Sequence, residues 1–180
     1  MIDILSLGEY NERQPEQRKR FAVNPVKTNA MRLLDQAGIS YETVTYPVDE
    51  SDLSGVHLAE SIGADVDRVF KTLVTRGDKN GLHVFVIPAA EELDLKKCAV
   101  VTGDKRIEMI AVKELLPLTG YIRGGCSPVG MKKAFPTHLD ELATLYDTIY
   151  VSGGQRGLQL VLNPMALADY IGASFADVTK

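Results

Sequence analysis

The chain has 180 residues, 45% of them hydrophobic and 24% charged, and a formal net charge of −4. This mix is typical of one folded globular domain and excludes an intrinsically disordered chain. No apolar run approaches the roughly 18 residues that a membrane-spanning helix needs, and the N-terminal residues lack the apolar core of a signal peptide, so we expect no membrane partner. The acidic balance argues against the broad basic surface of a DNA-binding protein, although it is compatible with a small local contact to RNA.

The chain has two cysteines, Cys98 and Cys126. Two cysteines cannot form a disulfide framework, and neither stands in the paired spacing of zinc ligands. We therefore expect no metal site and no cofactor, and a reducing compartment such as the cytoplasm.

Residues 1–24 differ from the rest of the chain. They are mostly polar and carry a basic cluster at Arg18, Lys19 and Arg20. We expect a flexible or loosely docked extension, and an RNA-contacting arm is the alternative. Residues 25–180 are expected to form the folded domain.

Helices and strands interleave along that domain. From N-cap residues and closing glycines, helices are predicted at 25–37, 55–63, 95–102, 111–116 and 164–171. The first is expected to start at Asn24 and Pro25, and the fourth to stop at Pro117. Strands are predicted from alternation and β-branched residues at 41–46, 68–77, 81–88, 106–110, 147–152, 157–162 and 173–178. No element is predicted between 119 and 146.

Adjacent hairpins exclude a purely parallel order of strands and helices. The sequence therefore predicts an α/β (mixed α+β) fold in a single domain, with a mixed β-sheet that curls toward a barrel between flanking helices.

Familiar catalytic motifs are absent, since neither a P-loop nor a serine-hydrolase elbow occurs. His83 alternates with apolar residues and is expected to be structural, whereas His57 and His138 are expected to be solvated. Cys98 and Cys126 are expected to pack as small hydrophobic side chains. A nucleophilic Cys126 paired with a histidine from elsewhere in the fold stays open as an alternative.

Lys71 is an unusual residue for its place, the predicted strand "RVFKTLV". Alternation puts it on the same face as two apolar residues, Val69 and Leu73. A lysine there is costly to bury unless it is paired or opens onto a cleft. Two interpretations stay open: an edge strand whose lysine reaches water, or an ammonium aimed into a pocket to hold an anion or polarise a carbonyl.

The stretch "TGYIRGGCSPVG", residues 119–130, contains adjacent glycines followed by a Ser-Pro step. Glycine lets a ligand approach the main chain, and proline offers no N–H. The pattern indicates a loop that presents backbone groups to a ligand.

Four separated segments carry a resemblance to a known family: "VFKTLV", "LDLKKCAVVTGDKRIEM", "TGYIRGGCSPVGMKK" and "IYVSGGQRGLQLVL". Their order and spacing resemble the YbaK/EbsC family of aminoacyl-tRNA editing domains, and the nearest subgroup is the Cys-tRNA(Pro) deacylases. The resemblance covers Val26 to the C-terminus. It implies a single YbaK-like domain with a barrel-like sheet. It also implies trans-editing, which clears a wrongly attached amino acid from the 3′ end of aminoacyl-tRNA, often in company with prolyl-tRNA synthetase.

The resemblance also implies roles for individual residues. Lys71 and the backbone N–H of Gly124 match the family's catalytic groups. The implied substrate-binding residues are Tyr46, Ser54, Thr72, Gly125, Ser127, Ser152 and Gln159. Ser54 replaces an aromatic residue and Gln159 a carboxylate of the Cys-tRNA(Pro) deacylases, which bears on the amino acid removed. The expected contacts to tRNA phosphates are Arg123, Lys132, Lys133 and Arg156.

No acid–base dyad is evident in the sequence, which fits the family's substrate-assisted scheme. In that scheme the cysteine thiol of the substrate attacks its own ester and leaves as a cyclic thiolactone. For a substrate without a thiol, an ordered water would have to replace this nucleophile. The alternative function is a non-catalytic module of the same fold that binds a nucleotide or a tRNA end.

Overall fold

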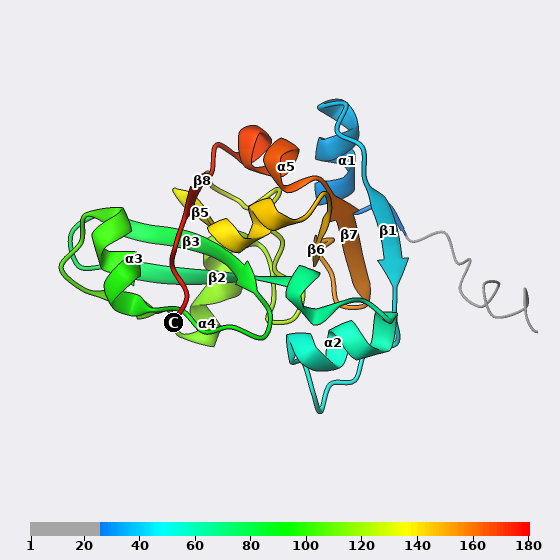
Figure 1. Cartoon of the computed structure of the whole chain (residues 1–180), viewed down its shortest axis with the longest axis horizontal. Coiled ribbons are helices and arrows are strands. Elements are labelled where there is room, and N and C mark those ends of the chain that lie inside the picture. The colour runs from blue at the N-terminus through cyan, green and yellow to red at the C-terminus, as the bar shows by residue number, and fades with distance from the viewer. Residues whose placement is uncertain (1–25) are drawn as a thin grey trace, which may run out of the picture.

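A computed structural model of the chain describes residues 26–180 (Figure 1). The predicted extension 1–24, with its basic cluster, and the predicted helix start at Asn24 and Pro25 lie outside the described residues.

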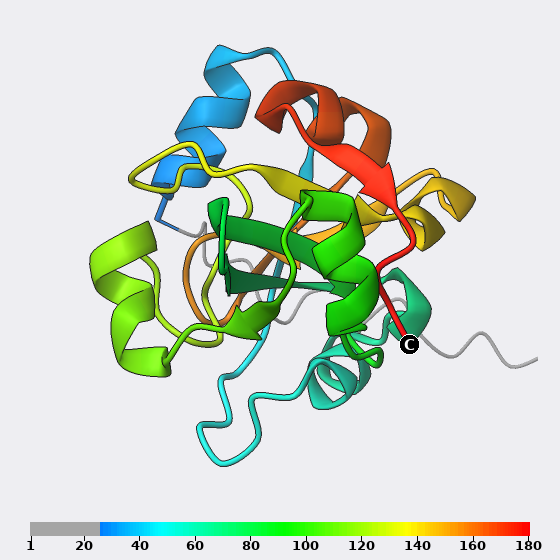
Figure 2. The same ribbon diagram turned by 90° about the vertical axis from the view of Figure 1, so that its left-hand side faces the viewer.

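The helices are short, and they surround the sheets on several sides, with α3 toward the viewer in Figure 2. They are α1 (Asn29–Gln36), α2 (Gly55–Ile62), α3 (Leu95–Thr102), α4 (Val112–Thr119) and α5 (Pro164–Ile171), with 3₁₀ turns η2 (Val66–Arg68) and η3 (Glu141–Leu145). Glycines in the left-handed conformation end α2, α3, α4 and α5. Within residues 26–180, none of the helices is long and apolar enough to cross a membrane.

The strands are β1 (Glu42–Thr45), β2 (Phe70–Gly77), β3 (Gly81–Pro88), β4 (Ile107–Met109), β5 (Thr137–Asp140), β6 (Ile149–Ser152), β7 (Leu158–Leu162) and β8 (Ser174–Ala176). The sequence pattern does not predict β5, because its residues "THLD" show no apolar alternation. This strand forms because β3 and β8 both pair with it in parallel.

The described strands form two sheets, with the orders β1-β7-β6 and β4-β2-β3-β5-β8 (Figure 1). The larger sheet is mixed, as predicted, because β4, β2 and β3 pair antiparallel whereas β5 and β8 are parallel to their neighbours. The expected curl toward a barrel needs correction. Among residues 26–180 the two sheets are joined by an isolated bridge between Val69 and Tyr150, and they do not close into a barrel.

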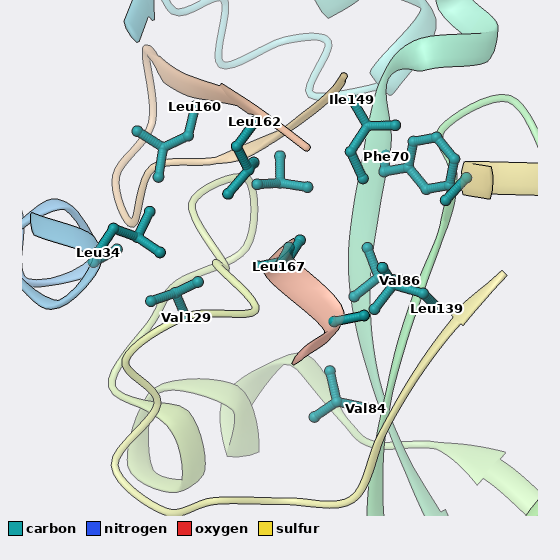
Figure 3. Packing of buried hydrophobic residues seen from close by; sticks show 14 of the residues in the cluster. Leu34, Phe70, Val84, Val86, Val129, Leu139, Ile149, Leu160, Leu162 and Leu167 are labelled. Atoms are coloured by element: carbon teal, nitrogen blue, oxygen red, sulfur yellow. The ribbon is translucent and has the colours of Figure 1, made fainter. Parts of the chain in front are cut away.

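The main core fills the space between the two sheets, with α1 and α5 over it (Figure 3). Its labelled side chains include Leu34 from α1, Leu167 from α5, Phe70 from β2, Val86 from β3, and Ile149 and Leu160 from the smaller sheet. The other face of the larger sheet presents Phe85 and Ile87 to α3, where Cys98 is buried mid-helix as predicted. Alternate side chains of β2 and β3 therefore pack into two separate hydrophobic cores.

Two helix ends differ from the predicted ones. The first helix begins later, at Asn29, because the side chain of Thr28 caps it. The fourth continues through Pro117, because the Gly120 N–H donates to the Leu116 carbonyl and closes the last turn. Proline near a helix end removes one backbone donor without stopping the remaining hydrogen bonds.

His138 is half-buried rather than solvated as predicted. Its ring stacks on Phe85 with the centroids 5.2 Å apart, and its Nδ1 lies 2.8 Å from the Ser174 hydroxyl. Burial lowers the pKa of His138, and the neighbouring His83 adds to this. The unpredicted pairing of β5 between β3 and β8 brings these side chains together.

The β2–β3 hairpin turn is tied to the end of α3 by the Asp104 carboxylate. One oxygen accepts hydrogen bonds from the N–H groups of Lys79 (2.8 Å) and Asn80 (2.7 Å), and the other lies 3.0 Å from His83 Nε2. A Cβ at Gly77 would stand 2.2 Å from this carboxylate, so only glycine fits there. His83 is therefore a structural residue, as predicted.

Asp104 should make the stability of the fold depend on pH. Burial by itself raises the pKa of this carboxyl, but hydrogen bonds from Thr102, Asn80 and Lys79 outweigh it and hold the pKa at about 2, below its ordinary 3.8. Below about pH 4 the unfolded chain then binds more protons than the folded chain, so the contribution present at neutral pH is lost as the pH falls toward about 2. Asp104→Asn should lower the free energy of unfolding at neutral pH, and this deficit should shrink in urea titrations at progressively lower pH. A deficit that stays constant below pH 4 would contradict the assignment.

Candidate functional site

A pocket of about 410 Å³ lies between α2, the first half of β2 and the β6–β7 end of the smaller sheet. This volume is in the range of ligand pockets, about 300–1,000 Å³. Most of the predicted site residues line it: Tyr46, Ser54, Lys71, Thr72, Arg123, Gly124, Ser152, Arg156 and Gln159.

The pocket exists because β2 is paired on both sides only at its far end. β3 pairs with the whole of β2, whereas β4 pairs only with Thr75–Gly77. The edge of β2 before Thr75 therefore borders the pocket instead of another strand. Each interpretation of Lys71 is partly right. Within residues 26–180 its part of the strand is an unpaired edge, and this edge faces a pocket.

Lys71 is half-buried at this edge, and its Nζ donates a hydrogen bond to the Ala89 carbonyl at 2.9 Å. Burial lowers the pKa of its ammonium, and the carboxylates of Glu92 and Glu91 oppose this shift. A partly desolvated ammonium interacts more strongly with a ligand's negative charge than one in water does. The side chain is therefore suited to hold an anion or to polarise a carbonyl.

Two buried side-chain oxygens in the pocket, Thr72 Oγ1 and Gln159 Oε1, have no hydrogen-bond partner among the described residues. Gln159 is 2% exposed and pairs with Ser152 across the β6–β7 ladder. A buried polar group without a partner costs about 1–3 kcal/mol, and such groups are rare. The two oxygens therefore mark positions where a ligand would make hydrogen bonds.

Two glycine loops meet at the pocket. Gly124 has φ = +83°, and in the described part of the chain no group accepts a hydrogen bond from its N–H. A Cβ on Gly125 would stand 3.1 Å from the backbone of Gln155 and of Arg156, so the loops are in close contact. Arg156 Nε donates to the Arg123 carbonyl at 2.9 Å and fastens one loop to the other. The Gly124 N–H is therefore a free donor whose position is fixed by the contact between the two loops.

The segment before α2 forms the rim of the pocket. Asp49 and Asp52 accept backbone hydrogen bonds from Ser51 and Ser54, which fold the segment into two tight turns. His57 is partly exposed, lines the pocket and has its Nε2 3.8 Å from Asp49 Oδ2. The sequence did not indicate a site role for His57; the available signal is its position in the first turn after the capping Ser54.

Four of the predicted site residues do not line the pocket. Ser127 is fully buried, and its Oγ accepts a hydrogen bond from the Val129 N–H at 3.2 Å, which serves the turn of its own loop. Gly125 lies where its own loop contacts the loop of Gln155 and Arg156. Lys132 reaches a carbonyl near the C-terminal end of α4 at 3.4 Å, and Lys133 follows it as an exposed residue.

Comparison with known proteins assigns this arrangement to a family. The family model of the aminoacyl-tRNA editing domain matches residues 54–170, a span that contains Lys71, Gly124 and Gln159. The chain belongs to this family of editing domains.

Individual relatives agree with this assignment. The editing domain is 50% identical over 153 residues to EbsC of Enterococcus faecalis, which is named as a candidate Cys-tRNA(Pro)/Cys-tRNA(Cys) deacylase; the match covers 85% of this chain and 93% of EbsC. It is 29% identical over 103 residues to a proline–tRNA ligase of Shouchella clausii, covering 57% of this chain and 18% of the ligase. A crystal structure titled as a candidate trans-editing enzyme for prolyl-tRNA synthetase superposes with a TM-score of 0.74 at 28% identity, over 85% of this chain and 98% of that one.

Cys126 lines the pocket of the editing domain, but its environment argues against a nucleophilic role. The side chain is 7% exposed, and burial raises the pKa of its thiol to about 12. The thiolate is the nucleophilic form, and it is scarce at neutral pH when the pKa is this high. Among residues 26–180, no hydrogen bond joins a histidine to Cys126. His83 and His138 bond to Asp104 and Ser174, and His57, which shares the pocket, has its Nε2 3.8 Å from Asp49 Oδ2.

Cys126→Ala should therefore keep most of the editing activity. In the folded protein near neutral pH, Cys126 should also react with iodoacetamide far more slowly than in urea, because its thiol is buried and protonated. Labelling followed by peptide mass spectrometry measures this directly. If Cys126→Ala folds normally but loses activity on the order of 10³-fold or more, as removal of a nucleophile does, the thiol takes part in the chemistry.

Proposed function

We propose that this editing domain is a trans-acting deacylase that removes cysteine from mischarged Cys-tRNA(Pro). The observation that carries the proposal is the meeting of the Lys71 ammonium and the free Gly124 N–H at one pocket. When an ester is cleaved, negative charge develops on its carbonyl oxygen, and a fixed backbone donor stabilises that charge without reorganising. The name of the 50% identical relative supports cysteine as the amino acid removed.

Lys71 and Gly124 have different roles in this reaction. The Gly124 N–H donates to the carbonyl oxygen of the aminoacyl ester, where charge develops. The Lys71 ammonium orients the terminal ribose or its phosphate and adds positive potential. Loss of one donor of this kind typically costs about 2.7–4 kcal/mol of transition-state stabilisation.

The substrate supplies the nucleophile. Its cysteine thiol attacks the carbonyl carbon of its own ester, so that a C–S bond forms and the C–O bond to the ribose breaks. The thiol proton passes to the released ribose oxygen, and the amino acid leaves as a cyclic thiolactone. This scheme fits the buried, protonated state of Cys126, which leaves the protein without an activated thiol of its own at the pocket.

Recognition of the tRNA is limited to its 3′ end in this proposal. Arg123 and Arg156 line the pocket, and Lys132 and Lys133 lie beyond it, while the chain as a whole carries a net charge of −4. Affinity for RNA grows with the number of phosphates neutralised, so these few contacts give weak and salt-sensitive binding. A synthetase would then select the tRNA body. The names of two relatives support prolyl-tRNA synthetase as that partner, and a role beside tRNA charging supports a cytoplasmic location.

The decisive experiment compares deacylation of Cys-tRNA(Pro) by the unchanged protein, Lys71→Ala and Lys71→Arg. Lys71→Ala removes a half-buried charge without leaving another unpaired, so the fold should survive. Its rate should fall by about a hundredfold or more, on the order of 2.7 kcal/mol at about 1.36 kcal/mol per decade. Lys71→Arg should restore only part of the rate, because a planar guanidinium does not take the place of a compact ammonium.

Near-equal rates for the three proteins, with melting temperatures unchanged, would leave Lys71 without a catalytic role. An unchanged protein that binds the tRNA end but releases no cysteine would favour the non-catalytic binding module. Parallel assays with Ala-, Ser- and Pro-charged tRNAs give the amino-acid preference.

Gln159 is expected to bind the α-amino group that every aminoacyl ester carries, since its buried Oε1 is free to accept a hydrogen bond. Gln159→Leu removes this acceptor, and kcat/KM should fall by about tenfold to a hundredfold, the effect of losing a hydrogen bond to a charged group worth about 1.5–3 kcal/mol. Gln159→Glu keeps an acceptor and should retain activity. Equal kcat/KM values for the unchanged protein and Gln159→Leu would exclude this contact.

A further inference from the structure

Gly55, the first residue of α2, lies closer to Ala89 than a residue with a side chain could. A Cβ at this position would stand 2.1 Å from the Cβ of Ala89 and 3.2 Å from its Cα, whereas real Cβ atoms essentially never come within 3.0 Å of such neighbours. The φ of Gly55 is not in the left-handed region. The position therefore requires glycine for space and not for backbone conformation.

Ala89, the residue that Gly55 contacts, also holds the Lys71 ammonium. The Ala89 carbonyl accepts a hydrogen bond from Nζ at 2.9 Å, and the Ala89 N–H donates to the Val69 carbonyl at 2.7 Å. Ala89 is 7% exposed and packs in one apolar cluster with Val69 and with Ala59 of α2. Because Ala89 hydrogen-bonds both to Val69, just before β2, and to the side chain of Lys71, a shift of its backbone shifts the acceptor that fixes the ammonium.

We propose that Gly55 is a positioning residue for the reaction: it sets the place of the Lys71 ammonium by letting α2 sit directly on Ala89. The inference rests on the proposed function of Lys71 and adds that α2 fixes its position. A side chain at Gly55 pushes the Ala89 backbone away from α2. The ammonium then follows the carbonyl or loses it, and in both cases it is misplaced relative to the Gly124 N–H.

The charges near Lys71 make its titration a reporter of this contact. Burial lowers the pKa of Lys71, and Glu92 and Glu91, which belong to the same loop as Ala89, oppose this. Glu92 is itself paired with Lys180. The other titratable or charged side chains that line the pocket are Tyr46, Asp49, Asp52, His57, Arg123, Cys126 and Arg156. A carbonyl that accepts from the ammonium stabilises its charged form, so loss of that carbonyl lowers the pKa of Lys71 further.

The test is a double-mutant cycle of Gly55→Ala, Ala89→Gly and both together. Gly55→Ala should lower kcat for Cys-tRNA(Pro) by about tenfold to a hundredfold, the range that a misplacement of about 1 Å can cause. The double variant removes the Ala89 Cβ, the atom met at 2.1 Å, and should recover most of the loss. Ala89→Gly alone supplies the reference for the coupling between the two positions.

Ile62→Ala is the matched control for general destabilisation. Ile62 lies at the other end of α2 and packs on the same apolar cluster, but it does not line the pocket. Ile62→Ala should lower the melting temperature and leave kcat unchanged. Gly55→Ala should also lower the melting temperature, because the contact at 2.1 Å strains the fold more than the better helix propensity of alanine offsets, but it should lower kcat as well.

An NMR titration of ¹³C-labelled lysines, with the Lys71 signal assigned from Lys71→Arg, reads the contact without any substrate. Gly55→Ala should lower the pKa of Lys71, and the double variant should bring it back toward the original value. An unchanged titration in Gly55→Ala, or a kcat loss that the double variant does not recover, would overturn the positioning role. Absence of deacylation by the unchanged protein would instead overturn the proposed function, and the titration would still decide whether Gly55 positions Lys71.

Discussion

Strand β2 has to place a charged side chain in the middle of an apolar pattern, and the rest of the site depends on how it does so. Phe70 and Val74 face the main core, whereas Lys71 lies on the opposite face. Because β4 ends its pairing at Thr75, no strand in residues 26–180 pairs with that edge of β2 beside Lys71. Extending β4 along β2 would cover the edge that the pocket needs, and burying the ammonium there would carry a desolvation cost that one carbonyl does not offset. The site therefore requires β4 to be short.

Several main-chain groups position the site around this edge. Lys71 is held by the Ala89 carbonyl, the Gly124 N–H is free, and the loop that contains it is fastened through the Arg123 carbonyl. Main-chain groups are fixed by the fold and do not rotate, so their geometry is set before a substrate arrives. This construction requires close approaches between segments, and a glycine such as Gly125 allows one where a Cβ would stand 3.1 Å from backbone.

A feature can be predicted from the sequence when it depends only on residues close to it along the chain. Helix α3, which Asp94 caps, and the β2–β3 hairpin depend on neighbouring residues, and the sequence predicts both elements. Lys71 stood out because its charge conflicts with the strand around it. By contrast, β5 forms only because two distant strands pair with it, so the burial of His138 had no local signal. Ser127 is expected to bind the substrate, but a sequence does not show which hydroxyl of a loop turns inward.

The proposed mechanism takes its nucleophile from the substrate, and this bears on specificity. A hydrophobic pocket distinguishes amino acids by only about 10–200-fold per methylene, so size alone would leave the editing domain poorly selective. If the attacking thiol belongs to the substrate, an ester that lacks it can occupy the pocket and still resist cleavage. Correctly charged Pro-tRNA(Pro), which has no thiol, is then spared by chemistry even when it is bound. In the proposed scheme a neutral, buried Gln159 is compatible with discrimination, because its proposed task is to orient the ester and not to reject the wrong one.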